Sequence, residues 1–360
     1  MQSAKPRIAV LYGGVSNEHE ISCLSARNVI AAIDSQNYEV LQIGITKSGA
    51  WYVQPDILKG ISDEALPSVL PIGTPVTLSL SREHNGLVAL DGSNIVTNLD
   101  AVFPVLHGRY GEDGTIQGAL EFAGIPCVGA GSLASALAMD KSQFKTIMKA
   151  CDIPTVAGVS ITRKSWNTSQ KACLQKIQQL TFPVFVKPAR AGSSVGVSKA
   201  NDEVTLIKAI ELASKSDDII VVEQAVGNPR EIECGVIVQH AVAKASVPAE
   251  IKVKSGYDFY SYEAKYVDDS TDLIVPAQLE PEVAEKIQAL ALKTFEAIGA
   301  TGYARVDFLI SDDGTIYVNE LNTIPGFTNI SMFPRMFVAS GFSYNELVDI
   351  LIHDALTRHG

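Results

Sequence analysis

The chain has 360 residues, of which 46% are hydrophobic and 19% are charged, values typical of a globular protein with well-formed cores. A single core rarely organises this many residues, so we expect two or three domains. The 29 basic and 40 acidic side chains give a net charge of −11, which argues against nucleic acid or an anionic membrane as the main partner.

The cysteines and the hydrophobic runs indicate a cellular compartment. The five cysteines are far apart and form no CxxC pair: Cys23, Cys127, Cys151, Cys173 and Cys234. This usage is typical of a reduced cytosolic protein and not of a disulfide framework or a zinc site. No signal-peptide pattern precedes the first predicted strand, and the longest uncharged run, residues 122–139, is broken by Pro126 and by glycines. We therefore expect a cytoplasmic protein without a membrane span.

The N-terminal part alternates strand and helix patterns. Residues 7–12 form a short apolar run that ends at a glycine pair, and residues 16–20 then lead into a helical pattern. Further strands are predicted at 40–46 and 101–106. This alternation predicts a parallel sheet whose ligands bind at the strand ends. Residues 49–100 are rich in turns, and we interpret them as an elaboration with short strands.

Two polar residues follow these strands directly. Glu18 lies just after the first strand, where a buried carboxylate could meet an ammonium group, but capping of the next helix would equally explain an acid there. His107 begins the loop 107–114, and its three glycines indicate that the backbone approaches something closely. A histidine in a surface loop is the alternative interpretation.

The central part places a lysine before a Gly/Ser loop. The apolar strand 182–187 ends on Lys187, and the loop 191–198 could cover phosphates with its N–H groups and hydroxyls. This is not a P-loop, because Lys187 precedes the glycines and no helix signal follows them. The strand 219–222 then leads into residues 223–226, an arrangement that resembles a hinge between two lobes.

The C-terminal part contains a predicted antiparallel hairpin, in which strands at 303–310 and 315–321 flank the turn 311–314. If Ser311 pairs with Gly314, Arg305 lies opposite Glu320. The remaining segments are a loop at 255–266 with five aromatic residues, which is an interface patch or an active-site lid, and helices at 281–299 and 344–356 separated by a Pro- and Gly-bearing loop at 323–334.

One face of this hairpin carries four polar residues, Arg305, Asp307, Glu320 and Asn322, whereas the other face is apolar apart from Asn319. Two carboxylates and an amide suit Mg²⁺ bound together with substrate phosphates. An arginine beside them suits charge that develops on a transferred phosphoryl group. A half-exposed hairpin with a cross-strand Arg–Glu pair explains the same residues without any function.

The order and spacing of these segments resemble the D-alanine–D-alanine ligase family of the ATP-grasp superfamily, from about Arg7 to the last helix. The motifs that carry this resemblance are GGVSNEHEIS, LHGRYGEDG, YEAKY, RVDF and NELN. The resemblance implies an α/β protein, α+β in its ATP-binding half, with an ATP-grasp fold. We expect an N-terminal parallel-sheet domain at 1–140, a central lobe at 141–228 and a C-terminal lobe at 229–360.

The same resemblance implies roles for individual residues. Catalytic roles fall on Glu18, Ser193, Tyr266 and Arg305. D-Alanine would contact Glu18, His107, Arg305, Gly326 and Ser331. ATP would contact Lys141, Lys187, Ser193, Ser194, Glu223, Val226, Glu231 and Lys265. The metal ligands would be Asp307, Glu320 and Asn322.

The activity that this resemblance implies is the ATP-dependent joining of two D-alanine molecules, through D-alanyl phosphate, for peptidoglycan precursors. It implies ATP and two Mg²⁺ ions as cofactors, with Mn²⁺ able to substitute, and it leaves a requirement for a monovalent cation open. It also implies a homodimer, with no nucleic-acid or membrane partner. Three alternatives stay open: a D-alanine–D-lactate ligase, which Tyr266 disfavours, another ATP-grasp carboxylate–amine ligase, and a nucleotide-binding protein without turnover.

Overall fold

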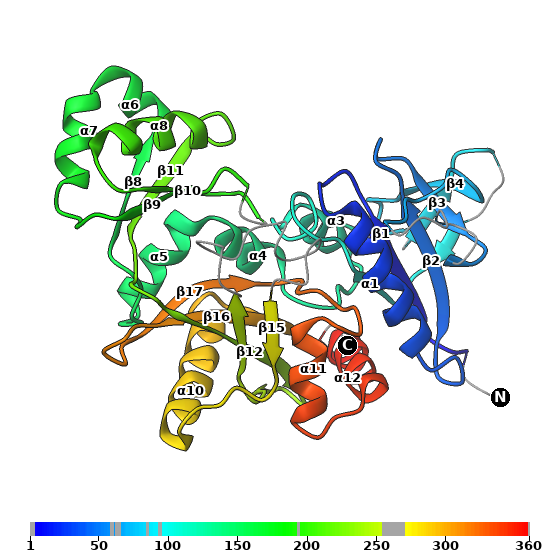
Figure 1. The fold of residues 1–360 in the computed structure, drawn as a ribbon. Coiled ribbons are helices and arrows are strands. Elements are labelled where there is room, and N and C mark those ends of the chain that lie inside the picture. Colours follow the sequence, from blue (N-terminus) through cyan, green and yellow to red (C-terminus); the bar gives the residue numbers. More distant parts are fainter. Residues whose placement is uncertain are drawn as a thin grey trace.

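The structure is a computed structural model that describes residues 4–57, 61, 66–83, 86–92, 96–192, 195–253 and 271–358. Three sheets organise it, in the order N-terminal, central and C-terminal along the chain (Figure 1). The central sheet and its helices stand apart at one end of the molecule, and helices α4 (Ser132–Met139) and α5 (Lys141–Ala150) run through its middle. The α/β fold expected from the sequence is confirmed.

The N-terminal sheet has the strand order β6-β5-β4-β3-β2-β1-β7. Its strands are β1 (Arg7–Gly13), β2 (Glu39–Ile45), β3 (Trp51–Gln54), β4 (Thr74–Leu78), β5 (Gly86–Ala89), β6 (Val96–Asn98) and β7 (Ala101–Pro104). Among the described strands of this sheet, the pairs β1–β2 and β1–β7 are parallel, as predicted. The segment 49–100 extends the same sheet with antiparallel strands, so the sheet is mixed. Helices α1 (His19–Ala32) and α3 (Thr115–Ala123) follow β1 and β7 in the chain.

The central sheet has the order β10-β9-β11-β8 and is antiparallel. Its strands are β8 (Gly158–Thr162), β9 (Val184–Pro188), β10 (Ser198–Ala200) and β11 (Ile219–Gln224). Helices α6 (Arg163–Thr168), α7 (Gln170–Ile177) and α8 (Glu203–Ala213) accompany it. Trp166, Ile210 and Val222 lie in the core that these elements form together.

The C-terminal sheet has the order β15-β14-β12-β16-β17, and β13 pairs with β12. Its strands are β12 (Arg230–Gln239), β13 (Val242–Ala245), β14 (Ala249–Val253), β15 (Thr271–Ile274), β16 (Tyr303–Ile310) and β17 (Ile316–Asn322). Helix α10 (Pro281–Ala297) packs on this sheet, and so do α4 and α5 through Ala138, Phe144 and Met148. The boundaries expected at 140 and 228 stay predictions.

The register of the β16–β17 hairpin differs from the one expected. The loop closes where Ser311 N–H donates to Thr315 O (3.0 Å), because the Asp313 carboxylate accepts from Thr315 N–H (3.0 Å) and shapes a longer turn. A bulge then leaves Asn319 without an opposite residue. Arg305 therefore lies opposite Asn322 and Asp307 opposite Glu320, so the predicted Arg305–Glu320 pairing is wrong.

The last two helices are α11 (Met332–Ala339) and α12 (Tyr344–Arg358). Helix α11 begins inside the loop expected at 323–334. Pro334 lies in its first turn, where the missing N–H breaks no helical hydrogen bond, so the proline does not prevent a helix there. Helix α12 packs in one core with β1, α1 and β7. None of the helices built from described residues is long and apolar enough to cross a bilayer.

Candidate functional site

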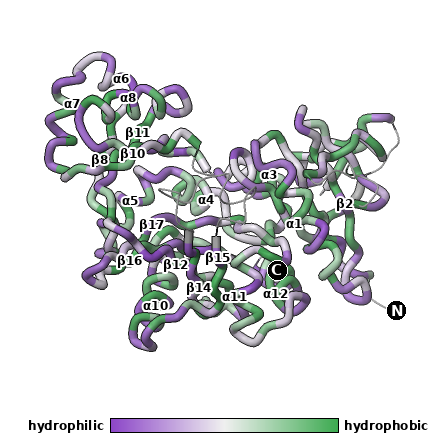
Figure 2. Tube along the Cα trace, in the orientation of Figure 1, coloured by the Kyte–Doolittle hydropathy of each residue, from purple (hydrophilic) through white to green (hydrophobic). Residues whose placement is uncertain are grey.

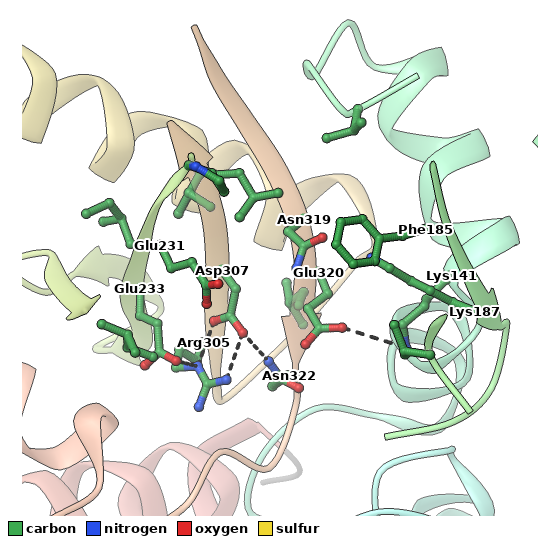
Figure 3. A pocket seen from close by; sticks show the side chains of 18 of the residues that line it. Lys141, Phe185, Lys187, Glu231, Glu233, Arg305, Asp307, Asn319, Glu320 and Asn322 are labelled. Atoms are coloured by element: carbon green, nitrogen blue, oxygen red, sulfur yellow. Dashed lines mark hydrogen bonds and ion pairs between the residues drawn. The ribbon is translucent and has the colours of Figure 1, made fainter. Parts of the chain in front are cut away.

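A cleft of about 870 Å³ is bounded by the central and C-terminal sheets, and residues of the N-terminal loops complete its lining. Hydrophilic residues interrupt β12 and β17 near the middle of the molecule, where these strands line the cleft (Figure 2). Figure 3 shows side chains from opposite sides of it. The cleft thus gathers polar groups from segments that are far apart in the sequence.

The four polar residues predicted on the hairpin share one face and line the cleft, as expected. The Arg305 guanidinium donates to both Asp307 oxygens (Nε–Oδ1 and Nη2–Oδ2, each 2.7 Å), and Asn322 Nδ2 donates to Asp307 Oδ2 (3.0 Å; Figure 3). Burial acts against the charge of Arg305, but the carboxylates of Asp307 and Glu233 outweigh it and raise its pKa. The arginine is therefore held charged and fixed in direction.

Glu233 belongs to the same group but was not predicted. It lies on β12 opposite Asp307, is only 5% exposed, and its Oε1 is 3.2 Å from Arg305 Nε. Strand alternation could have identified it. Residues two apart in a strand point to the same face, so Glu233 shares a face with Glu231, which was predicted to contact ATP. We call Glu233, Arg305, Asp307, Glu320 and Asn322 the acidic cluster.

Lys141 connects the acidic cluster to the other side of the cleft. Its Nζ is 3.7 Å from Glu320 Oε2 and donates to Ala191 O (2.9 Å), beside the Gly/Ser loop. The lysine begins α5, where the Asp140 side chain caps the helix by accepting from Ser142 N–H and Gln143 N–H. This capped helix start holds the Lys141 ammonium where the two sheets approach each other.

The opposite side of the cleft carries a buried acid between two lysines. Glu223, on β11, is 4% exposed. Its Oε2 accepts from Lys187 Nζ of β9 (2.7 Å), and its Oε1 is 2.9 Å from Lys145 Nζ of α5. Burial acts to raise the pKa of Glu223, but the two ammonium groups lower it to about 2. We call Lys145, Lys187 and Glu223 the basic cluster, of which Lys145 was not predicted.

Glu18 lies in the cleft beside the loops that the sequence placed there. Glu18 is the N-cap residue of α1, as the alternative interpretation held, but its side chain makes no capping hydrogen bond to the helix. A methyl group added to Gly108 would come within 2.6 Å of Glu18 Oε2, and one added to Gly192 within 3.6 Å. Gly108 also has a φ of +72°, so two constraints favour glycine at that position.

His107 is buried (5% exposed) and not a surface residue as one interpretation held. Its Nδ1–H donates to Ile324 O (2.9 Å), and its Nε2 is 3.1 Å from Ser25 Oγ. Burial acts to lower the pKa of His107, but the carboxylates of Glu112 and Glu18 outweigh it and raise the pKa above 6.5. The histidine thus ties the N-terminal loops to the segment that follows β17.

The segment after β17 brings Gly326 into the cleft. Ser331 lies next to it, since a methyl group added to Gly326 would be 2.9 Å from Ser331 Oγ. That hydroxyl accepts from Thr328 N–H (3.0 Å) and bonds the Thr328 hydroxyl (2.7 Å). The Ser331 side chain therefore shapes this loop around Gly326.

The remaining predicted residues divide into two groups. Val226 and Glu231 line the cleft, as does Asn319, which was expected on the apolar face but is turned by the bulge into the cleft (Figure 3). Four predicted residues lie outside the described part of the chain: Ser193, Ser194, Lys265 and Tyr266.

The donor set of the acidic cluster fits a divalent cation that is shared with a ligand. Within the described ranges, no three His, Cys, Asp or Glu side chains come close enough to bind a metal alone. Asp307 and Glu320 offer oxygen donors from directly paired positions of two strands, and Asn322 lies two residues after Glu320 and contacts Asp307. Two carboxylates and an amide suit Mg²⁺, which keeps water ligands and takes the rest from phosphates.

Comparisons with known proteins agree with this geometry. Family descriptions of the D-ala D-ala ligase N-terminus and C-terminus match residues 7–130 and 147–353. A D-alanine–D-alanine ligase from Nocardia farcinica (strain IFM 10152) is 45% identical over 359 residues, covering 98% of this chain and 97% of that one.

Solved structures show the same likeness. The VanG D-Ala:D-Ser ligase from Enterococcus faecalis superposes with a TM-score of 0.86 at 35% identity, over 98% of this chain and all of that one. The D-alanine–D-alanine ligase from Coxiella burnetii has a TM-score of 0.81 at 33% identity, over 99% and 96% of the two chains. ATP and a divalent metal are the cofactors of this family. The chain belongs to the D-alanine–D-alanine ligase family.

Proposed function

We propose that the protein joins two D-alanine molecules to D-alanyl-D-alanine with ATP, through D-alanyl phosphate, for peptidoglycan precursors. One observation carries this proposal: the acidic cluster, the basic cluster and the N-terminal residues Glu18 and His107 all meet at a single cleft. A carboxylate is a poor electrophile at neutral pH, so its ligation needs activation by phosphoryl transfer. That transfer depends on positioning and charge neutralisation, which are what these three groups offer.

The chain's own residues divide the work as follows. Glu18 binds the ammonium of the first D-alanine, and the Gly326 loop takes the carboxylate of the second. Lys141 and Lys187 hold the ATP phosphates, and Val226 and Glu231 hold the nucleoside. Mg²⁺ bound by Asp307, Glu320 and Asn322 neutralises phosphate charge when present; we propose two ions, for which Mn²⁺ can substitute.

The reaction proceeds in two transfers. A carboxylate oxygen of the first D-alanine attacks the γ-phosphorus, and the bond from that phosphorus to the β-phosphate oxygen breaks to release ADP. The deprotonated amine of the second D-alanine then attacks the acyl carbon, and inorganic phosphate leaves. Arg305 stabilises the transferred phosphoryl group and then the oxyanion, because its guanidinium is half-buried, charged and fixed at the cleft.

The test is phosphate release from MgATP with D-alanine, L-alanine, D-alanine plus D-lactate, or D-alanine plus D-serine, with products identified by mass. We expect phosphate and D-alanyl-D-alanine with D-alanine alone and none with L-alanine. A depsipeptide or a D-alanyl-D-serine product in preference to the dipeptide would overturn the acceptor assignment, and the VanG likeness makes the D-serine arm necessary. If no phosphate is released with any of these substrates, the ligase assignment is overturned.

We further propose that the protein works in the cytoplasm as a homodimer. The five cysteines, none of them in a disulfide, and the use of ATP support the compartment. The family resemblance supports the dimer, and light scattering on a sizing column tests it: a monomer at micromolar concentration would contradict the proposal. Activity across Na⁺ and K⁺ concentrations tests the open question of a monovalent cation.

A further inference from the structure

In the basic cluster two lysines contact one carboxylate, so the cluster has one more positive charge than negative charge. Glu223 is almost fully buried and each of its carboxylate oxygens has its own lysine, Lys187 at 2.7 Å and Lys145 at 2.9 Å. Lys187 and Glu223 line the cleft, whereas Lys145 contacts Glu223 from α5 and is not part of the lining. A second contact, to Val156 O (3.4 Å), holds the Lys145 ammonium in that position.

Burial decides what this arrangement can do. A buried carboxylate needs a charged or hydrogen-bonding partner, and removing one partner of a buried pair is strongly unfavourable. If Lys187 alone compensated Glu223, a phosphate could not draw Lys187 away without leaving the carboxylate as an isolated buried charge. With Lys145 present, two ammonium groups face one carboxylate, so one positive charge is available to a ligand.

We propose that Lys145 is a positioning residue for the nucleotide phosphates. It retains the Glu223 carboxylate when Lys187 turns toward an anionic ligand in the cleft, and it thereby allows Lys187 to change partners. This inference rests on the proposed function in one respect, namely that the anionic ligand is ATP. It assigns to Lys145 no contact with ATP.

The experiment compares Lys145→Met with Lys145→Arg and with Lys149→Met. Lys149 is an exposed lysine one turn later on α5, so it controls for the loss of a positive charge from the same helix. Dissociation constants for MgATP are measured by calorimetry without D-alanine, at a temperature where each variant is folded. We expect Lys145→Met to weaken binding at least about tenfold, the size of a lost charged hydrogen bond. Lys145→Arg should recover most of the affinity, and Lys149→Met should match wild type.

A double-mutant cycle with Glu223→Gln separates positioning from a merely structural role. Once the carboxylate is removed, Lys187 is free without help, so Lys145→Met should change MgATP affinity less than about twofold in that background. An equal loss in both backgrounds, or wild-type affinity in folded Lys145→Met, would overturn the proposal. A wild-type protein that binds MgATP but makes no dipeptide would overturn the proposed ligase function and leave this test intact.

Discussion

The acidic and basic clusters face one cleft and carry excess charge of opposite sign. The basic cluster has two lysines and one carboxylate, whereas the acidic cluster has one arginine and three carboxylates. Each cluster thus neutralises part of its charge internally and presents a surplus. The sign of the excess charge therefore determines which ligand each cluster attracts: phosphates for the basic cluster and a cation for the acidic cluster.

The largest expected effect comes from the acidic cluster. Glu320→Gln removes one anionic ligand at nearly constant shape, so we expect turnover to fall roughly 10²–10³-fold, the size found when one group that stabilises developing charge is lost. The thermal midpoint should change little, because Glu320 is half-buried and its Lys141 contact is 3.7 Å long. Initial rates and circular dichroism check both. Near-wild-type turnover would remove the metal assignment.

The next effect comes from the basic cluster. Lys187→Met should weaken MgATP binding by about 2 kcal/mol, or roughly 30-fold, because a charged hydrogen-bond donor to phosphate is lost. The Mg²⁺ concentration for half-maximal activity at saturating ATP should stay within about twofold. Calorimetry and magnesium titrations measure the two quantities. If the half-maximal Mg²⁺ concentration rose as much as the MgATP affinity fell, the two clusters would not act separately.

Glu233→Gln should have a smaller effect, and on the metal. Without Glu233, Arg305 loses one of the carboxylates that it contacts and keeps its ion pair with Asp307. Asp307 is then held more firmly by the arginine, so the half-maximal Mg²⁺ concentration should rise up to about tenfold, the low end for a group outside the ligand set. Glu231→Gln, on the same face of β12, should raise the KM for ATP instead. The reverse pattern would contradict both assignments.

The last prediction concerns stability and not activity, as a change with pH. The folded pKa of Glu223 is about 2, below its usual 4.5, so its contribution is present above pH 4.5 and disappears as the pH falls toward 2. The difference in free energy of unfolding between wild type and Glu223→Gln should therefore shrink over that range. Urea unfolding at several pH values measures it. A constant difference from pH 5 to pH 3 would show that folding does not lower the pKa of Glu223.

The sequence predicts the acidic cluster better than the basic one, for a physical reason. Arg305, Asp307, Glu320 and Asn322 lie on two strands of one hairpin, so strand alternation alone places them on one face. The register of the hairpin was not predicted, because a longer turn and a bulge at Asn319 both shift the pairing and no composition signal marks the bulge.

The basic cluster comes from separate elements, so its geometry depends on how a helix packs against two strands. Lys145 lies one turn after Lys141 on α5, and that spacing shows that the two lysines share a helix face. It does not show that Glu223 of β11 is buried against that face, since tertiary packing decides this. The same limit explains why His107 could be taken for a surface residue.

The position of α12 has a consequence for how the chain is made. Phe103 of β7 and Val10 of β1 are buried in one core with Leu351 of α12, and the Tyr38 hydroxyl donates to Asp349 (2.8 Å) across 311 positions of sequence. During synthesis, α1 can cover part of the hydrophobic face of the N-terminal sheet early, but the part that packs on α12 stays uncovered by this helix until the end of the chain leaves the ribosome. Such a nascent chain exposes an aggregation-prone surface for most of its translation, and we expect chaperones to bind it there.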